Sequence, residues 1–397
     1  MAGGLFLLVA LAFAAVVFNA IKPSKGPYSL VPSWLLAFLT TDLAFFHIAL
    51  QLIFAGGFIL AGALETLPGK LALLVIFSSS AALLVLWLPN LRAASATESV
   101  AKTLDLDEAN PIPRSLMWTP LRRKHDGIEV TRDVEFFRAS GRALKMDIYR
   151  GSSGGDRRPA LVFLHGGGWI MGDKCNQGLP LCNHLASLGW VCANANYRLS
   201  PGASWPDQLV DAKAAIVWMR EHADEYGVDP GFIAITGGSA GAHIAAMTAL
   251  TPGDAGLQPG FEDKDASIQA AVMFYGVYDL TNRLGVHRPA FQTKLVGPHV
   301  LKAFPDIEPE KFSAASPREN VDKVSQPWLL LQGDRDSLTP VREARDFAEA
   351  LRESSEYPVG YAELPGAQHA FDIYYSPRAI AAVELTARFL TTEYRRV

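Results

Sequence analysis

Apolar residues are distributed unevenly along this chain, and their pattern separates a short N-terminal part from a longer C-terminal part. Near the N-terminus lie three apolar stretches without charged residues, Leu5–Ile21, Leu43–Leu64 and Leu71–Leu88. Glu65 and Lys70 lie in the short segment between the last two stretches. The second stretch has the length of about 20 residues that a membrane-spanning helix needs. Trp34 and Trp87 stand where aromatic residues anchor helices at a membrane surface.

A buried helix would explain any one of these stretches, and a cleaved signal peptide would explain the first. The first stretch lacks the basic residues that precede the apolar core of a signal peptide. Three such stretches so close together do not fit the core of a soluble domain. We therefore expect residues 1–91 to form a transmembrane region of three helices.

Residues 92–120 have a mixed, polar composition and contain Pro111, Pro113 and Pro120. Proline interrupts helices and central strands, so this segment is expected to be a linker. Residues 121–397 are long enough for one large domain.

Short apolar segments alternate with helical patterns throughout residues 121–397. The expected strands are Val130–Arg138, Leu144–Tyr149, Ala160–His165, Val191–Tyr197, Phe232–Thr236, Ile268–Tyr275, Trp328–Gln332 and Tyr361–Leu364. Apolar residues at helical spacing predict helices over Asp207–Tyr226, Ala240–Leu250 and Val341–Glu353. This alternation predicts a mostly parallel sheet flanked by helices, with the first two strands paired at its edge.

The sequence GGSAG, residues 237–241, joins an expected strand to an expected helix. In this context the pattern G-x-S-x-G predicts a nucleophile elbow, a sharp turn that lifts a serine hydroxyl above the edge of the sheet. A side chain at Gly237 or Gly241 would collide with the neighbouring strand and helix. Ser239 is therefore the expected nucleophile, and the start of the following helix adds positive potential for an anionic intermediate.

A serine hydroxyl needs a base to become a good nucleophile. Of the nine histidines, His369 alone follows both Ser239 and a late expected strand, in the segment ELPGAQHAF. His243 lies on the helix that leads away from the elbow, so we expect it to pack or to face solvent. His369 is the expected base; the alternative is a loop histidine bonded to solvent.

The acid that orients this base should lie between Ser239 and His369, because a serine, acid, histidine order is typical of the α/β-hydrolase fold. The segment WLLLQGDRDSLTP offers Asp334 and Asp336. Asp336 is better placed to enter the loop after the strand, and Asp334 is expected to cap the turn. An acid in this position fixes the tautomer of the imidazole and stabilises its charged form.

The segment HGGGW, residues 165–169, directly follows an expected strand. Its glycines let the backbone come close to a substrate, so the amides of Gly167 and Gly168, with that of Ala240, are the expected donors of an oxyanion hole. His165 is expected to anchor the loop by hydrogen bonds. A phosphate-binding loop is the rival interpretation, but no G-K-[ST] sequence follows, and no ribose-binding acid is evident.

Charge and cysteine content narrow the possible functions further. A net charge of −4 provides no basic surface for nucleic acid. The three cysteines are an odd number without metal-ligand spacing, and we interpret them as ordinary thiols. We expect no metal and no cofactor.

The motifs HGGGW, NYRLSP (residues 196–201) and GGSAG, together with the segments around Asp336 and His369, resemble those of the hormone-sensitive-lipase-type α/β-hydrolases. The resemblance is particularly to membrane-associated carboxylesterases of mycobacteria and other actinobacteria, and it covers roughly residues 120–395. It implies hydrolysis of carboxylic esters with short or medium acyl chains. The chain departs from the family at Gly238, where aspartate is common, and at Ala370, where glycine is common.

These features predict a membrane-anchored serine esterase that acts on a small-molecule or lipid ester through a Ser239-His369-Asp336 triad. A deacetylase of lipids or glycans, or an amide hydrolase, would use the same groups. A catalytically dead binding module would lack a member of the triad, and none is missing.

The distribution of basic residues also predicts an orientation in the cell membrane. With three spans, Lys22, Lys25, Arg92 and Lys102 flank the membrane on the side of the hydrolase, and Lys70 lies on the other side. The positive-inside rule then favours a hydrolase domain in the cytoplasm. The family resemblance favours the opposite side, because some relatives are envelope or cell-surface enzymes.

Overall fold

The computed structural model covers residues 1–397 and describes all of them except 25, 27, 109, 140, 153–154 and 156. Within the described residues, eight strands form one sheet in the order β1-β2-β4-β3-β5-β6-β7-β8. The strands are β1 (Ile128–Ala139), β2 (Arg142–Gly151), β3 (Arg158–Leu164), β4 (Val191–Ala195), β5 (Val228–Gly238), β6 (Ala270–Phe274), β7 (Trp328–Gly333) and β8 (Val359–Leu364). Each lies where the apolar segments predicted a strand.

The sheet is parallel from β4 through β8, whereas β1 pairs antiparallel with β2 and β2 pairs antiparallel with β4. The central strands are buried along nearly their whole length, as in β3, where every residue after Arg158 is buried. Such continuous apolar runs are typical of parallel strands covered on both faces. This is the arrangement of the α/β-hydrolase fold, with the predicted strand pair at one edge.

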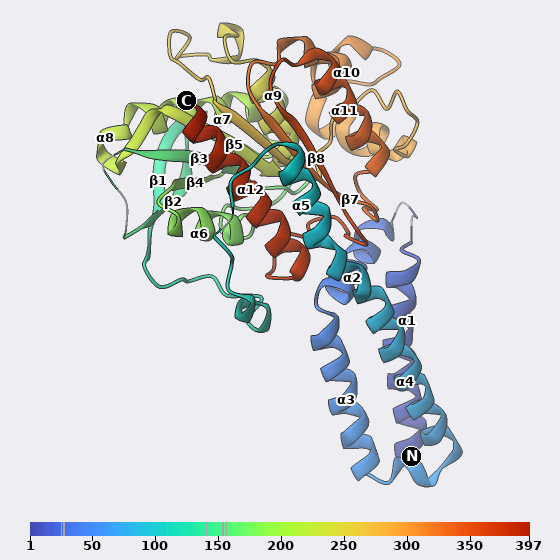
Figure 1. Ribbon diagram of the computed structural model, residues 1–397. Helices are drawn as coiled ribbons and strands as arrows, with labels where there is room; N and C mark the ends of the chain where they lie inside the picture. The colour runs from blue at the N-terminus through green and yellow to red at the C-terminus, as the bar shows by residue number, and fades with distance from the viewer. Residues whose placement is uncertain (25, 27, 109, 140, 153–154, 156) are drawn as a thin grey trace.

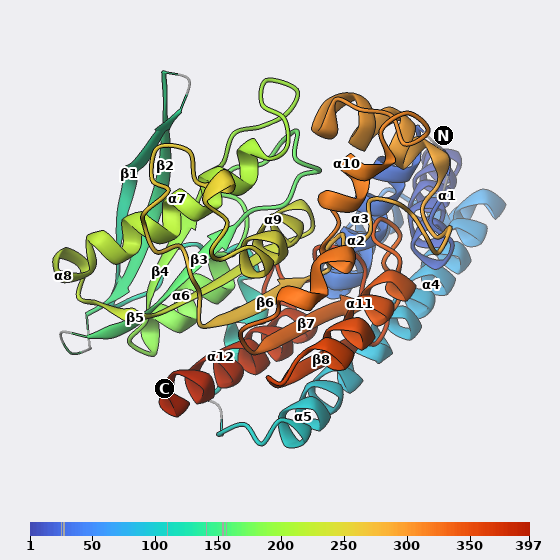
Figure 2. The same cartoon turned by 90° about the horizontal axis from the view of Figure 1, so that it is seen from above.

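Two layers of helices cover the sheet. One face packs against α7 (Asp207–Glu221), α9 (Ala240–Leu250) and α11 (Val341–Ser354). The other face packs against α6 (Leu179–Ser187), α12 (Pro377–Arg396) and α5 (Ala93–Thr103). Viewed from above, α7 and α9 lie on one side of the sheet and α12 and α5 on the other (Figure 2). The helix expected over Asp207–Tyr226 is divided, with α8 (Ala223–Tyr226) as its second part, and α10 (Pro309–Ala314) is a short helix before β7.

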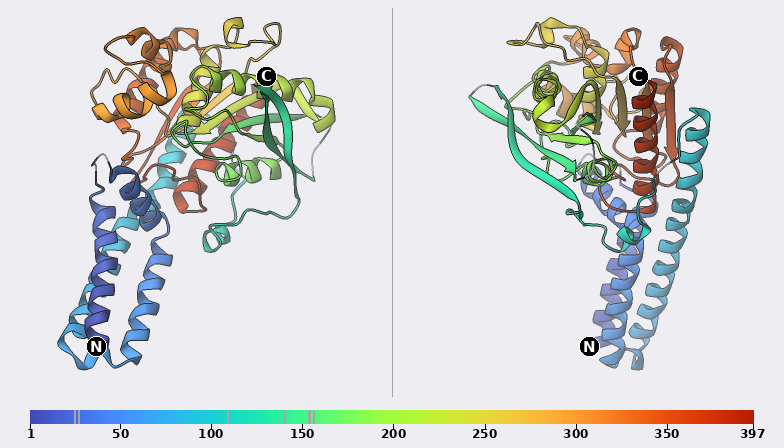
Figure 3. Two further views of the ribbon diagram at one scale, coloured as in Figure 1. Left: turned by 180° about the vertical axis from the view of Figure 1, so that it is seen from behind. Right: turned by 60° about the vertical axis from the view of Figure 1, so that its left-hand side comes forward.

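The N-terminal helices form a separate bundle that projects from one end of this domain (Figures 1 and 3). They are α1 (Ala2–Ile21), α2 (Leu30–Asp42), α3 (Ala44–Leu60) and α4 (Leu67–Trp87). Among the described residues, two helices, Ala2–Ile21 and Leu67–Thr103, could cross a membrane by length and composition, and a third span is possible if α2 and α3 count as one. The pair α2 and α3 is bent by 88° at its junction, which the sequence analysis did not anticipate.

Residues 92–120, expected to be a linker, begin with a packed helix. Two of the four alanines of α5, Ala93 and Ala101, are fully buried in the core formed with α6 and α12. The small side chains of these alanines let α5 pack closely on the core, so most polar residues of α5 lie on the outer face of the helix. The division of the chain at 92–120 stays a prediction, although the first part of the segment is not an extended connection.

Helix α2 lies against the loop between β8 and α12. The Phe38 ring stacks on Tyr374 with centroids 5.6 Å apart, and the Trp34 indole N–H donates to the carbonyl oxygen of His369 at 3.1 Å. Trp34 therefore packs on the hydrolase domain, where the sequence suggested a membrane anchor. At the end of α2, Asp42 Oδ1 lies 3.4 Å from Arg378 Nη1, and both side chains are at most 1% exposed.

This ion pair predicts a large effect on stability. Asp42→Ala would leave the buried guanidinium of Arg378 without its counter-charge, which destabilises proteins by about 3–5 kcal/mol. We expect a clear fall in Tm for the full chain in detergent, measured by differential scanning fluorimetry.

The matched control is Asp107→Ala. Asp107 pairs with Arg395 at 2.6 Å, but these side chains are 47% and 64% exposed. An exposed pair contributes about 0–1 kcal/mol, so this variant should keep nearly the Tm of the wild type. Equal shifts for the two variants would show that the docking of α2 does not depend on the Asp42–Arg378 pair.

Candidate active site

The turn between β5 and α9 holds Ser239 in a strained conformation. Its φ of 57° and ψ of −120° lie outside the regions that non-glycine residues favour. The Ser239 N–H donates to the carbonyl oxygen of Phe274, at the end of β6, at 2.9 Å. Strain of this kind clusters at functional sites, where the surrounding structure enforces it.

Two glycines allow this turn because backbone lies directly against them. A Cβ on Gly237 would lie 2.5 Å from the carbonyl carbon of Gly241 and 2.7 Å from the carbonyl oxygen of Leu164. A Cβ on Gly241 would lie 2.5 Å from the carbonyl oxygen of His165 and closer still to that of Leu164. These backbone atoms cannot move without displacing β3 or α9, so both positions require glycine, as the sequence suggested.

Asp336 and His369 are hydrogen-bonded to each other across the loops that follow β7 and β8. Their Oδ2 and Nδ1 atoms are 2.7 Å apart, and the side chain of Asp336 is fully buried. Asp336 Oδ1 accepts from the backbone N–H groups of Leu338 and Thr339, each at 2.8 Å. Its Oδ2 also accepts from the Thr339 hydroxyl and from the Gln332 amide. These donors fix the carboxylate in a position to orient the imidazole.

Asp334 has a different place. Its Oδ1 accepts from the Gly366 N–H at 2.6 Å, and burial raises the pKa of this carboxyl above its ordinary value. Asp334 therefore ties the β7 loop to the β8 loop, which differs from the expected cap of its own turn.

Tyr275 brings the elbow and the histidine together. Its ring lies 4.6 Å from that of His369, centroid to centroid, and a Cβ on Gly238 would lie 2.8 Å from its hydroxyl oxygen. Among the described residues no hydrogen bond joins Ser239 to His369. Hydrogen bonds between catalytic groups are often long without substrate and tighten in the Michaelis complex.

The two departures from the family pattern have structural consequences here. Tyr275 occupies the space that a side chain at position 238 would need, and its hydroxyl donates to the buried carboxylate of Asp372. Burial raises the pKa of Asp372 to about 6. Ala370, next to His369, has a φ of 68° in the left-handed region, where a non-glycine residue is strained by about 1–2 kcal/mol.

The loop after β3 presents two glycine amides at the edge of the site. Gly167 and Gly168 have positive φ angles of 129° and 60°. In the part of the chain that the structure describes, neither amide has an acceptor, whereas the Gly166 N–H is bound by Gln177 Oε1 at 2.6 Å. Ala240 is the first residue of α9, so its N–H has no partner within the helix.

His165 and His243 are both structural. The carbonyl oxygen of His165 accepts from the Tyr197 hydroxyl at 2.8 Å, and the two rings stack. The fully buried His243 accepts from the Trp169 indole N–H and donates to the carbonyl oxygen of Ala315. Burial lowers the pKa of His243 to about 4, so a neutral ring packs in the core.

The sequence analysis missed the residues that support this constellation: Trp34, Tyr275, Gln332, Thr339 and Asp372. Gln332 and Thr339 stand close to Asp336 in the chain, so a polar residue at the end of an apolar strand was a usable signal. Tyr275 stands at the end of an expected strand beside the elbow strand, and this position was a weaker signal. Trp34 is 335 residues from His369, and no local pattern predicts that contact.

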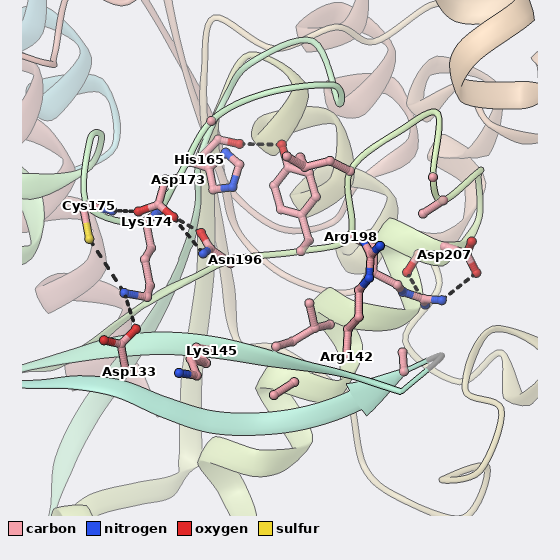
Figure 4. Close-up of a pocket in the computed structure, with 18 of the residues that line it drawn as sticks. Asp133, Arg142, Lys145, His165, Asp173, Lys174, Cys175, Asn196, Arg198 and Asp207 are labelled. Atoms are coloured by element: carbon pink, nitrogen blue, oxygen red, sulfur yellow. Dashed lines mark hydrogen bonds and ion pairs between the residues drawn. The ribbon is translucent and has the colours of Figure 1, made fainter.

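A cavity of about 710 Å³ lies beside the loop that follows β3 (Figure 4). Lys174, buried in its wall, pairs with Asp147 at 2.7 Å and with Asp133 at 3.2 Å. None of Ser239, Asp336 and His369 lines this cavity, whereas His165, at the end of the strand that leads to the glycine loop, does. Among the described residues, no group of three or more His, Cys, Asp or Glu side chains could hold a metal ion.

Comparisons with known proteins identify a family and several related esterases. The BD-FAE family model matches residues 146–351, which include Ser239 and Asp336. The probable carboxylic ester hydrolase LipM of Mycobacterium tuberculosis is 36% identical over 98% of this chain and 93% of its own length. The esterase LipC of the same organism is 40% identical over 60% of this chain and 59% of its own length.

A solved structure is similar as well. The esterase Est2 of Thermogutta terrifontis, with butyrate bound, is 29% identical, covers 67% of this chain and 94% of its own, and has a TM-score of 0.56. The same esterase has been solved phosphonylated by sarin. The chain therefore belongs to the BD-FAE family, among the hormone-sensitive-lipase-type α/β-hydrolases, and is a carboxylic ester hydrolase.

Proposed function

We propose that this enzyme is a serine esterase in which Ser239 is the nucleophile, His369 the general base and Asp336 the orienting acid. The observation that carries this proposal is the buried Asp336–His369 hydrogen bond of 2.7 Å, next to the strained elbow that exposes Ser239. A histidine held by a carboxylate beside an activated serine is the arrangement that acyl transfer to water requires.

In this mechanism the Ser239 hydroxyl attacks the ester carbonyl while His369 takes its proton. The oxyanion that forms accepts hydrogen bonds from the amides of Gly167, Gly168 and Ala240. His369 then protonates the leaving alcohol and later activates the water that releases the acid and restores Ser239. Asp336 keeps its charge throughout and stabilises the imidazolium.

We also propose that the N-terminal bundle anchors the enzyme in a membrane, with α1, bent α2–α3 and α4 as three spans of a region that ends near residue 91. Large apolar side chains on the outside of the bundle support this, for example Leu8, Ile53 and Phe77, which are 66%, 71% and 72% exposed. Such a surface needs an apolar surrounding, because transfer of apolar area from water to lipid is favourable.

The orientation follows from which ends of the helices carry basic residues. α1 starts at the far end of the bundle and ends beside the hydrolase domain, where Lys22 follows it (Figure 1). α4 starts at the far end of the bundle and has Lys70 in its first turn. Arg92 follows α4 on the hydrolase side, and Lys25 lies outside the described residues. The basic excess on the hydrolase side supports a domain on the cytoplasmic face.

Replacement of the nucleophile is the direct test of the mechanism. Ser239→Ala should lower kcat for p-nitrophenyl butyrate by about 10⁴–10⁶-fold, because only binding and oxyanion stabilisation remain. A fluorescent organophosphate should label the wild type and the control Ser187→Ala, which changes an exposed serine of α6, but not Ser239→Ala. Labelling of another serine with activity retained would refute the assignment.

The two aspartates after β7 should differ sharply. Asp336→Asn removes the charge that holds His369, and the equivalent change in a serine protease lowers kcat by about 10⁴. Asp334→Asn keeps an oxygen that can accept from the Gly366 N–H, so kcat should change little. Steady-state kinetics on both variants decides the matter: similar mild losses would mean that the acid lies elsewhere, and a reversed order would assign the role to Asp334.

The orientation is tested with protease added outside intact spheroplasts. The hydrolase domain should resist digestion until the membrane is broken, as a cytoplasmic marker does, while a marker on the outer surface is digested at once. Immediate digestion of the domain would place it outside and would overturn the count of spans or of charges.

A further inference from the structure

A second cavity, separate from the one in Figure 4, lies between the N-terminal segment and the hydrolase domain. Its volume is about 570 Å³. Three parts of the chain line it: Tyr28 and Leu30 before and at the start of α2, residues within 285–295 after β6, and the segment from Asp336 to Arg342, which covers the loop after β7 and the start of α11. The cavity is therefore built jointly by the two parts of the chain.

This cavity borders the proposed catalytic groups on two sides. Asp336 and the next two residues of the acid loop form one wall. Leu295 forms another, and its Cδ2 lies 3.9 Å from the position that a Cβ on Gly168 would occupy. A ligand in the cavity thus lies next to both the acid loop and the oxyanion loop.

Three cations line the cavity without acidic partners. Arg288, Lys294 and Arg342 are all exposed, and none forms an ion pair with any carboxylate among the described residues. Lys294 Nζ lies over the face of the Tyr28 ring, 5.6 Å from the ring centroid. By contrast, Arg283 and Arg318 each have an acidic partner, because both pair with Asp346.

The carboxylates around the cavity cannot serve these cations. Asp336 is fully buried, and its oxygens are occupied by His369, Leu338 and Thr339. Glu343, beneath the wall, is paired with the lining residue His287. The cavity therefore carries uncompensated positive charge, next to apolar surface from Leu30, Phe291 and Leu295.

We propose that this cavity binds an anionic group on the ester substrate, a phosphate or a carboxylate, and that Arg288, Lys294 and Arg342 select for it. Guanidinium groups bind such planar or tetrahedral oxyanions through charge-assisted hydrogen bonds. The apolar residues contact the hydrocarbon part of the same molecule. This inference rests on the proposed function, because it places the anion beside the site where the ester is cleaved.

The test uses two isosteric esters, 3-acetoxybenzoate and 3-acetoxybenzamide, which differ in charge and share the same scissile acetyl group. Full-length enzyme in detergent should show a kcat/KM at least about tenfold higher for the anionic ester, since a hydrogen bond to a charged group contributes about 1.5–3 kcal/mol. The preference should lie mainly in KM and should fall as salt is raised. Equal values for the two esters would overturn the proposal.

The triple variant R288Q/K294Q/R342Q should lose most of this preference. R288K/R342K keeps the positive charges but loses the paired guanidinium donors, so its preference should lie between those of the triple variant and the wild type. The charge-matched control R123Q/R142Q/K145Q removes three other cations that form no ion pair among the described residues, two of which line the cavity of Figure 4. The control should keep the preference of the wild type. If the triple variant does not fold, the comparison of the two esters in the wild type still decides the question.

A second experiment, with lipid substrates, identifies the source of the anion. Mixed micelles containing phosphatidylglycerol or uncharged diacylglycerol with the same acyl chains are compared by fatty-acid release. Faster cleavage of phosphatidylglycerol, lost in the triple variant, would indicate a phospholipid head group, and preference for the soluble anion alone would indicate a small ester. Failure of the proposed function is distinguishable, because Ser239→Ala would then still cleave both soluble esters.

Discussion

The close approach of helix α9 to the carboxyl end of strand β3 is the constraint on which the site depends. The carbonyl oxygen of Leu164 lies so near Gly237 and Gly241 that any side chain at either position would displace the strand or the helix. This contact forces the chain through the conformation seen at Ser239 and sets the first amide of α9 opposite the loop that continues from β3. The elbow and the proposed oxyanion donors are therefore two results of one packing contact.

The same contact propagates to the next strand. The Ser239 N–H donates to the carbonyl oxygen of Phe274. Tyr275, the residue that follows Phe274, therefore lies over Gly238 and against the His369 ring. The Tyr275 hydroxyl then reaches Asp372, on the loop that carries His369. Glycine at 238, tyrosine at 275 and aspartate at 372 form one packed group, so the departure of this chain from the common family pattern at position 238 accompanies a change in what fills the space above the elbow.

Local patterns in the sequence predicted the features that depend on local interactions. The central strands are continuous buried apolar runs, and the more exposed strands β1, β2 and β8 were anticipated as well. The glycines around Ser239 revealed the elbow because close packing excludes a side chain there. The pairing of Asp336 with His369 was expected from their places after late strands, while their catalytic roles stay predictions. Contacts between distant segments could not be anticipated in this way: the bend between α2 and α3, the burial of α5 and the bond from Trp34 to His369 depend on surfaces that meet only in the folded chain.

These long-range contacts change the interpretation of the N-terminal region. An anchor alone would need only a flexible connection to the enzyme, yet α2 contacts the backbone of His369 through Trp34, and Asp42 neutralises a buried arginine at the start of α12. Tyr28, just before α2, also forms part of the wall of the cavity beside Asp336. A region that supports the histidine loop and lines a cavity next to the acid loop belongs to the active site as much as to the bundle. Any movement of α2 relative to the hydrolase domain would thus reach His369 and this cavity together, which makes the helix a physical connection between the bundle and the proposed site of ester cleavage.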